Sequence, residues 1–214
     1  MANEIRMTEM HVEHAVITVE GKSDLIINKM NASATRQLLS DDRKAAKLVE
    51  DQHKNKWEDI ITSIHWRDPL PVEDTNIGCT EELLKTLLKE NAPCISALGF
   101  KKSWNDAVVW LGIDQYKTKF NAAVNIVVSG GKVPIKFSEH FIQDLVIPGK
   151  GKRGTITARL NHFTGWSAEI PIEYTTNVYS LNEIVAIINS AGFSIGIGSG
   201  RTSGYGRYEI VDVK

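Results

Sequence analysis

Residues 194–214, SIGIGSGRTSGYGRYEIVDVK, carry the strongest indication of the fold. Five glycines surround Arg201 and Arg207, and the stretch ends in GRYEIVDV, which has the composition of a strand. Glycine lets backbone amides approach a phosphate or another backbone segment, while arginine supplies charge and directed hydrogen bonds. This composition predicts either a phosphate-binding loop or a tight packing turn with solvated arginines.

The glycine-rich stretch differs from the common nucleotide-binding motifs. It lacks the Gly-Lys-Ser/Thr ending of a P-loop, and it leads into a strand, whereas a dinucleotide-binding fingerprint opens a helix. We therefore expect no nucleotide cofactor.

The elements before this stretch are marked by local signals. Ser180 and Glu183 form a capping box, which predicts a helix that Gly192 should end. Residues 155–163 and 166–174 alternate apolar and polar residues, and we expect them to form a hairpin around Thr164 and Gly165. Pro171 cannot donate a ladder hydrogen bond, so its strand should lie at an edge or be bulged there.

The first half combines strands with a helical region. We expect a strand over residues 11–21, one or two helices over 31–64, a helix capped by Thr80, a strand over 122–128 and a turn over 129–132. Together these elements predict an α+β protein with a ferredoxin-like, RNA-recognition-motif-like core, an antiparallel sheet and a helical insertion at about 31–100. The absence of an internal repeat or a low-complexity linker indicates one domain over residues 1–214.

Composition limits the classes of function. The chain has 25 basic and 26 acidic residues, so nucleic acid could be bound only by a local basic patch. Cys79 and Cys94 indicate neither a disulfide framework nor a zinc site, and the scattered histidines predict no metal. The polar N-terminus and the lack of a long apolar run predict a cytoplasmic protein without a membrane anchor.

Two further segments combine features suited to nucleic acid. GKGKRG, residues 149–154, places Lys150, Lys152 and Arg153 on a predicted loop tip, where they could neutralise phosphates. FKKSW, residues 100–104, combines Lys101 and Lys102 with Trp104, whose ring could stack on a base or belong to the core.

The helix ending in AG, followed by FSIGIGSGRTSGYGRYEI, resembles the C-terminal glycine-rich signature of the RAMP superfamily, which forms CRISPR effector backbones and processes CRISPR RNA. ITVEGKSDLIINKM, near the N-terminus, is similar to the first strand of the backbone subunits. The match is closest to backbone-type subunits of phage and mobile-element relatives. The resemblance implies binding of single-stranded nucleic acid, mostly RNA, and side-by-side oligomerisation. The residues that carry the pattern are Gly198, Gly200, Arg201, Gly204, Tyr205, Gly206 and Arg207.

The leading hypothesis is a non-catalytic protein that binds the backbone of single-stranded nucleic acid and multimerises. Arg201, Arg207 and the 150–153 loop would contact phosphates, and Tyr205 or Trp104 would stack on bases. One alternative is a metal-independent RNA endonuclease with His65 or His162 as the base, although no catalytic motif supports it. Another is a phage-encoded interaction module that mimics a CRISPR backbone subunit and inhibits the complex.

Overall fold

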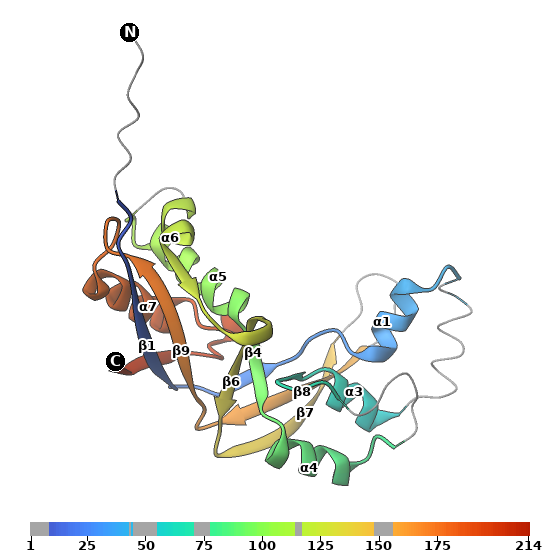
Figure 1. Cartoon of the computed structure of the whole chain (residues 1–214). Coiled ribbons are helices and arrows are strands. Elements are labelled where there is room, and N and C mark those ends of the chain that lie inside the picture. The colour runs from blue at the N-terminus through green and yellow to red at the C-terminus, as the bar shows by residue number, and fades with distance from the viewer. Residues whose placement is uncertain (1–8, 43, 45–54, 71–77, 114–116, 148–155) are drawn as a thin grey trace.

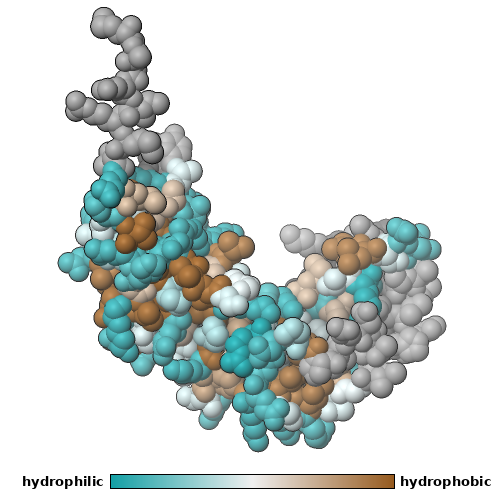
Figure 2. Space-filling view, in the orientation of Figure 1, coloured by the Kyte–Doolittle hydropathy of each residue, from teal (hydrophilic) through white to brown (hydrophobic). Residues whose placement is uncertain are grey.

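The computed structural model describes residues 9–42, 44, 55–70, 78–113, 117–147 and 156–214. Figure 1 shows a bent molecule with two arms. In the sheet arm, helices α5, α6 and α7 lie against β1 and β9; in the helical arm, α1, α3 and α4 lie around β7 and β8. Figure 2 shows the same bend in space-filling form, with hydrophobic residues gathered in separate patches on each arm.

The helices and strands follow one another along the chain. The helices are α1 (Ala32–Leu39), α3 (Lys56–Thr62), α4 (Glu81–Glu90), α5 (Ala97–Trp110), α6 (Thr118–Ala123) and α7 (Leu181–Ser194), with short 3-10 turns η1 (Ser129–Gly131) and η2 (Arg201–Ser203). The strands are β1 (Val12–Gly21), β2 (Leu25–Ile27), β3 (His65–Trp66), β4 (Pro93–Ser96), β5 (Val124–Ile126), β6 (Lys132–Lys136), β7 (Glu139–Ile147), β8 (Ile156–Thr164), β9 (Ser167–Thr175) and β10 (Tyr208–Val213).

The larger sheet has a ferredoxin-like centre. Within the described residues its strand order is β10-β1-β9-β6-β4-β3, with β5 also paired to β9, and every pairing is antiparallel. The series β1, α5, β6, β9, α7, β10 is the β-α-β-β-α-β sequence of the ferredoxin-like fold. The predicted α+β class is therefore confirmed. The range 31–100, predicted to be a helical insertion, holds α1, α3 and α4 but also β3 and β4 of this sheet.

Two predictions about the strands were wrong. Strands β8 and β9 do not form a hairpin, because β8 pairs with β7 and β2 in a second sheet while β9 pairs with β1, β5 and β6. The chain changes sheets at Gly165, whose φ is +54° and whose missing Cβ leaves room for the Ser138 hydroxyl. Trp166 then lies against Gly21, and its indole Nε1 donates to the Ser23 carbonyl at 2.9 Å.

Pro171 lies inside the sheet rather than at its edge. It is opposite Val16 of β1, and on its other side the partner of β9 changes from β5 to β6. The Pro171 carbonyl still accepts from the Val127 amide on that side, at 2.9 Å. The missing N–H of proline therefore falls at the junction between two partner strands, where no ladder bond is lost.

The two predicted N-terminal helix caps are present in the structure. Thr80 caps α4 by accepting from the Leu83 amide, and Ser180 and Glu183 form the capping box of α7. Gly192, however, does not end α7, which continues to Ser194. A Cβ at Gly192 would lie 2.1 Å from the Tyr208 carbonyl oxygen, so this glycine allows α7 to pack closely on β10.

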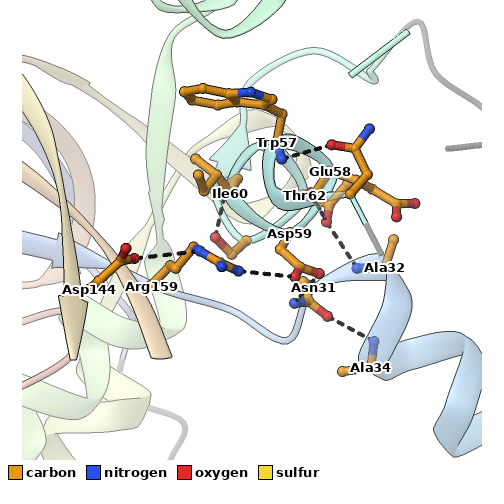
Figure 3. A network of polar contacts seen from close by, with 12 residues as sticks. Asn31, Ala32, Ala34, Trp57, Glu58, Asp59, Ile60, Thr62, Asp144 and Arg159 are labelled. Atoms are coloured by element: carbon orange, nitrogen blue, oxygen red, sulfur yellow. Dashed lines mark hydrogen bonds and ion pairs between the residues drawn. The ribbon is translucent and has the colours of Figure 1, made fainter. Parts of the chain in front are cut away.

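A polar network ties the helices of the helical arm to the second sheet (Figure 3). Asn31 caps α1 at the Ala34 amide and donates from Nδ2 to Asp59 of α3 at 2.8 Å. Arg159 of β8 lies 3.6 Å from Asp59 and 3.4 Å from Asp144 of β7. The carboxylates of two elements thus share one guanidinium.

The buried apolar residues form one continuous core that extends into both arms. It includes Ile17 and Ile170 of the larger sheet together with Ile60, Ile61 and Leu84 of the helical arm. None of the helices in the described ranges combines the length and the apolar character needed to cross a membrane.

Candidate nucleic-acid interface

The glycine-rich segment, residues 195–207, is a folded loop attached to the link between β1 and β2. The Gly206 amide donates to the Asp24 carbonyl at 2.8 Å, and the Ser199 amide donates to the Ile26 carbonyl at 2.9 Å. Ser23 Oγ donates to the Gly204 carbonyl and accepts from the Arg207 amide. The segment is therefore a rigid support for the two arginines.

Glycine is required where this loop meets other backbone. At Gly206, with φ +69°, a Cβ would lie 1.9 Å from the Ile197 carbonyl oxygen; at Gly198, with φ +74°, it would lie 2.5 Å from that of Ile26. No side chain could be inserted there without moving the backbone. Gly198 and Gly206 are therefore needed for the loop to pack closely against neighbouring backbone.

Arg201 and Lys102 line one groove of about 220 Å³ where the two arms meet. The groove is formed by the end of β2, by β3, by the start of α5 and by the glycine-rich loop. Its polar lining includes Asn28, His65 and Ser96, and no carboxylate lines it. Arg201 is half-buried and forms no ion pair or side-chain hydrogen bond with any described residue. Its guanidinium therefore remains available to an anion.

The electrostatic surroundings of this groove are positive. Burial, followed by the charges of Lys29 and Lys132, lowers the pKa of His65 below its ordinary value. Burial, followed by the charge of Lys132, also lowers the pKa of Lys29. Cations so placed favour an anionic ligand, since it would relieve their mutual repulsion.

Arg207 lies in a different place from Arg201. It lines a larger hollow of about 770 Å³ together with Trp110, Phe193 and Lys22. Its Nη1 donates to the Phe193 carbonyl at 2.6 Å, the one side-chain hydrogen bond recorded for it among the described residues. The loop therefore presents its two arginines to two separate concavities.

The residues of the FKKSW segment all belong to α5, but Lys101, Lys102 and Trp104 lie in three different environments. Lys102 is exposed at the groove, whereas Lys101 donates to Asn125 Oδ1 at 2.9 Å, away from it. Trp104 is completely buried, and its Nε1 donates to the Tyr208 hydroxyl. The prediction that Trp104 could stack on a base was wrong, because its ring belongs to the core.

Of the other residues predicted to contact nucleic acid, three are described by the structure and three are not. Gly200 and Gly204 flank η2 in the left-handed conformation and so orient Arg201. Tyr205 is half-buried, with its ring against Gly200 and in a T-shaped contact with His162 at a ring-centroid distance of 5.3 Å. Lys150, Lys152 and Arg153 lie outside the described residues.

The two histidines considered as catalytic bases differ in access. His162 is only 2% exposed, with its ring stacked on Phe141 and its Nδ1 3.6 Å from Asp24. His65 is half-buried and lines the groove beside Arg201. Within the part of the chain that the structure describes, no group of three or more His, Cys, Asp or Glu side chains is suited to a metal ion.

Comparison with known proteins gives a structural likeness without a sequence family. No family model matches the chain, and no curated protein matches it. A chain in the cryo-EM structure of the Type III-B Cmr-beta bound to cognate target RNA superposes with a TM-score of 0.57 at 12% identity. That likeness covers 95% of this chain and 60% of the other, so this chain spans less than two thirds of its neighbour's length. Cmr6 from Pyrococcus furiosus, at 13% identity over 96% of this chain and all of the other, gives a TM-score of only 0.33, too low to compare folds. The first likeness supports the predicted α+β fold.

Sequence reasoning missed part of the groove and most of the larger hollow. Asn28 and Ser96 carry no motif, and Trp110 and Phe193 look like ordinary core residues in helical sequence. The signal that could have marked Phe193 is its position one residue after Gly192, about 100° around α7 from the face that packs on β10.

Proposed function

We propose that the protein binds single-stranded RNA through its phosphate backbone, with Arg201 and Lys102 as the central contacts. The observation that carries the proposal is the groove that these two cations line without any carboxylate. The likeness to a chain from an RNA-bound complex supports the same class of ligand. Lys150, Lys152 and Arg153 are proposed as further phosphate contacts, and assembly with related subunits or further copies along the strand belongs to the same proposal.

The open face of the larger sheet does not suit a polyanion. Glu20, Glu169 and Glu173 share the face of β1 and β9 that lies opposite the buried residues, and Lys136 pairs with Glu169 there. Carboxylates at that face would repel phosphates. We therefore place the RNA in the groove rather than across the sheet.

The test is binding of labelled single-stranded RNA, followed by fluorescence anisotropy at several salt concentrations. The double variant Arg201→Ala, Lys102→Ala should bind all sequences more weakly to a similar extent. If each residue contacts one phosphate, the slope of log K against log salt should fall by about 1.4, because each contact on a single strand contributes about 0.7.

Lys101→Ala is the matched control. It removes the same charge from the neighbouring residue of the same helix, but Lys101 faces Asn125 instead of the groove. It should leave affinity and salt slope close to those of the wild type. Equal effects of Lys101→Ala and Lys102→Ala would show a diffuse charge effect and contradict the groove.

RNA cleavage is a second candidate, favoured by the position of His65. Its lowered pKa keeps the imidazole neutral at pH 7, so that it can accept a proton from a ribose 2′-hydroxyl while Arg201 stabilises charge on the phosphate. Incubation with end-labelled RNA and with the DNA of the same sequence tests this. Cleavage of RNA alone that His65→Ala abolishes would support it, while intact RNA would leave binding as the function.

A further inference from the structure

The hollow around Arg207 combines exposed rings with cations. Phe193, near the end of α7, is 82% exposed, and Trp110, the last residue of α5, is 63% exposed. Both line the same concavity of about 770 Å³. Large aromatic side chains so exposed lose the free energy of burial, which indicates a surface that a ligand covers.

The charged residues of this hollow are arranged for an anion beside the rings. Arg207 uses one of its guanidinium donors on the Phe193 backbone carbonyl, which holds the cation beside that residue in the lining of the hollow. Lys22 adds a second cation, which is paired with the Glu209 carboxylate. A nucleotide offers a flat base to a ring and a phosphate to a guanidinium, so its two parts match the two kinds of side chain.

We infer that this hollow is a stacking site for an unpaired base, in which Trp110 or Phe193 contacts the base and Arg207 binds the adjoining phosphate. The inference rests on the proposed function and extends it to a second contact region. The two regions lie toward the two ends of α5, since Gly99 lines the groove and Trp110 lines the hollow, eleven residues or about 16 Å along the helix axis. The glycine-rich loop joins them, because it carries Arg201 at one and Arg207 at the other.

A protein surface is the competing occupant. Val109, Leu111 and Ile113 next to Trp110 are also exposed, and such a run would suit an apolar partner. These three residues do not line the hollow, however, whereas the cations Lys22 and Arg207 line it beside the rings. The cations of the hollow therefore favour nucleic acid. The polar and charged lining residues of the hollow are Lys22, Ser23, Asn189, Ser194, Arg207 and Glu209.

The test combines a change in the rings with a change in the RNA. The double variant Trp110→Leu, Phe193→Leu keeps apolar side chains but removes both rings, and it should bind single-stranded RNA roughly five-fold or more weakly, as expected for loss of a stacked base. On RNA carrying abasic residues, wild type and double variant should bind equally. The ring-retaining variant Trp110→Phe, Phe193→Tyr should bind as the wild type does. Leu39→Ala, at a residue of α1 that is 78% exposed, should change nothing.

The outcomes separate this inference from the proposed function. If the double variant binds like the wild type while Arg201→Ala, Lys102→Ala weakens binding, the stacking site is wrong and the groove stands. If the wild type binds no RNA, both proposals fall. If removal of the rings abolishes self-association in sedimentation but leaves RNA affinity unchanged, the hollow is a protein interface and the inference is overturned.

Discussion

Trp104 Nε1 donates a hydrogen bond to the Tyr208 hydroxyl at 3.1 Å, which joins α5 to β10 inside the core. Burial raises the pKa of Tyr208 well above its ordinary value, so the phenol stays protonated. Tyr208→Phe should lower the free energy of unfolding by about 1–3 kcal/mol, because it leaves the Trp104 N–H buried without a partner. Chemical denaturation measures this, with Tyr205→Phe as the control, since Tyr205 is only half-buried. If Tyr205→Phe lowered the free energy of unfolding as much as Tyr208→Phe, the stabilising role of the Trp104–Tyr208 hydrogen bond would be contradicted.

Close approach of α7 to β10 makes Gly192 intolerant of a side chain. Gly192→Ala should destabilise the protein by about 1–3 kcal/mol, as overpacked cores do, because its methyl group would meet the Tyr208 carbonyl. Gly99→Ala in α5 is the matched control. Its methyl group would have only an ordinary contact, 3.6 Å from Ile95, so stability should be unchanged or raised by up to about 1 kcal/mol. A neutral Gly192→Ala in thermal melts would disprove the close packing.

The two carboxylates that share Arg159 should differ in their contribution to stability. Asp59 has a side chain only 17% exposed and also accepts from Asn31, so Asp59→Ala should cost about 1–3 kcal/mol. Asp144 is 56% exposed, and Asp144→Ala should cost less than about 1 kcal/mol. Urea denaturation of both variants in the same buffer checks the order, and a larger loss from Asp144→Ala would contradict the network in Figure 3.

Two half-buried histidines should make stability depend on pH. Burial is the main cause that lowers the pKa of His65 and of His140, so the unfolded chain binds more protons than the folded one below about pH 6.5. The free energy of unfolding should therefore fall as pH decreases from about 6.5 toward 5. His65→Gln should reduce this decrease. Denaturation at a series of pH values measures how the free energy of unfolding changes with pH. A rise in stability on acidification would refute the prediction.

The parts of the fold that the sequence predicted depend on neighbours in the chain. The capping box at Ser180 and Glu183 and the cap at Thr80 need only residues within one helical turn, and both formed as expected. The failed hairpin depended on a distant segment, because β9 pairs with β1, more than 140 residues away, instead of with β8. Helix α5 has no local start signal, since Ser96 makes no capping hydrogen bond.

The candidate site was only partly predictable for the same reason. Arg201 stood out because of the glycines around it, but the groove also needs Asn28, His65 and Lys102 from segments far away in sequence. Trp104 could not be distinguished from an exposed stacking residue until its contact with Tyr208 was known. The sequence shows which residues are charged, whereas tertiary contacts decide which of these charged side chains face solvent.

The pairing of β1 with both β9 and β10 has a consequence for the order of folding. Both sheet neighbours of β1 are synthesised more than 140 residues after it. A nascent chain can therefore form its local helices during translation, but its central sheet cannot be completed until β10 has been synthesised. Until then the apolar face of β1 needs protection from aggregation, by a chaperone or by transient contacts within the chain.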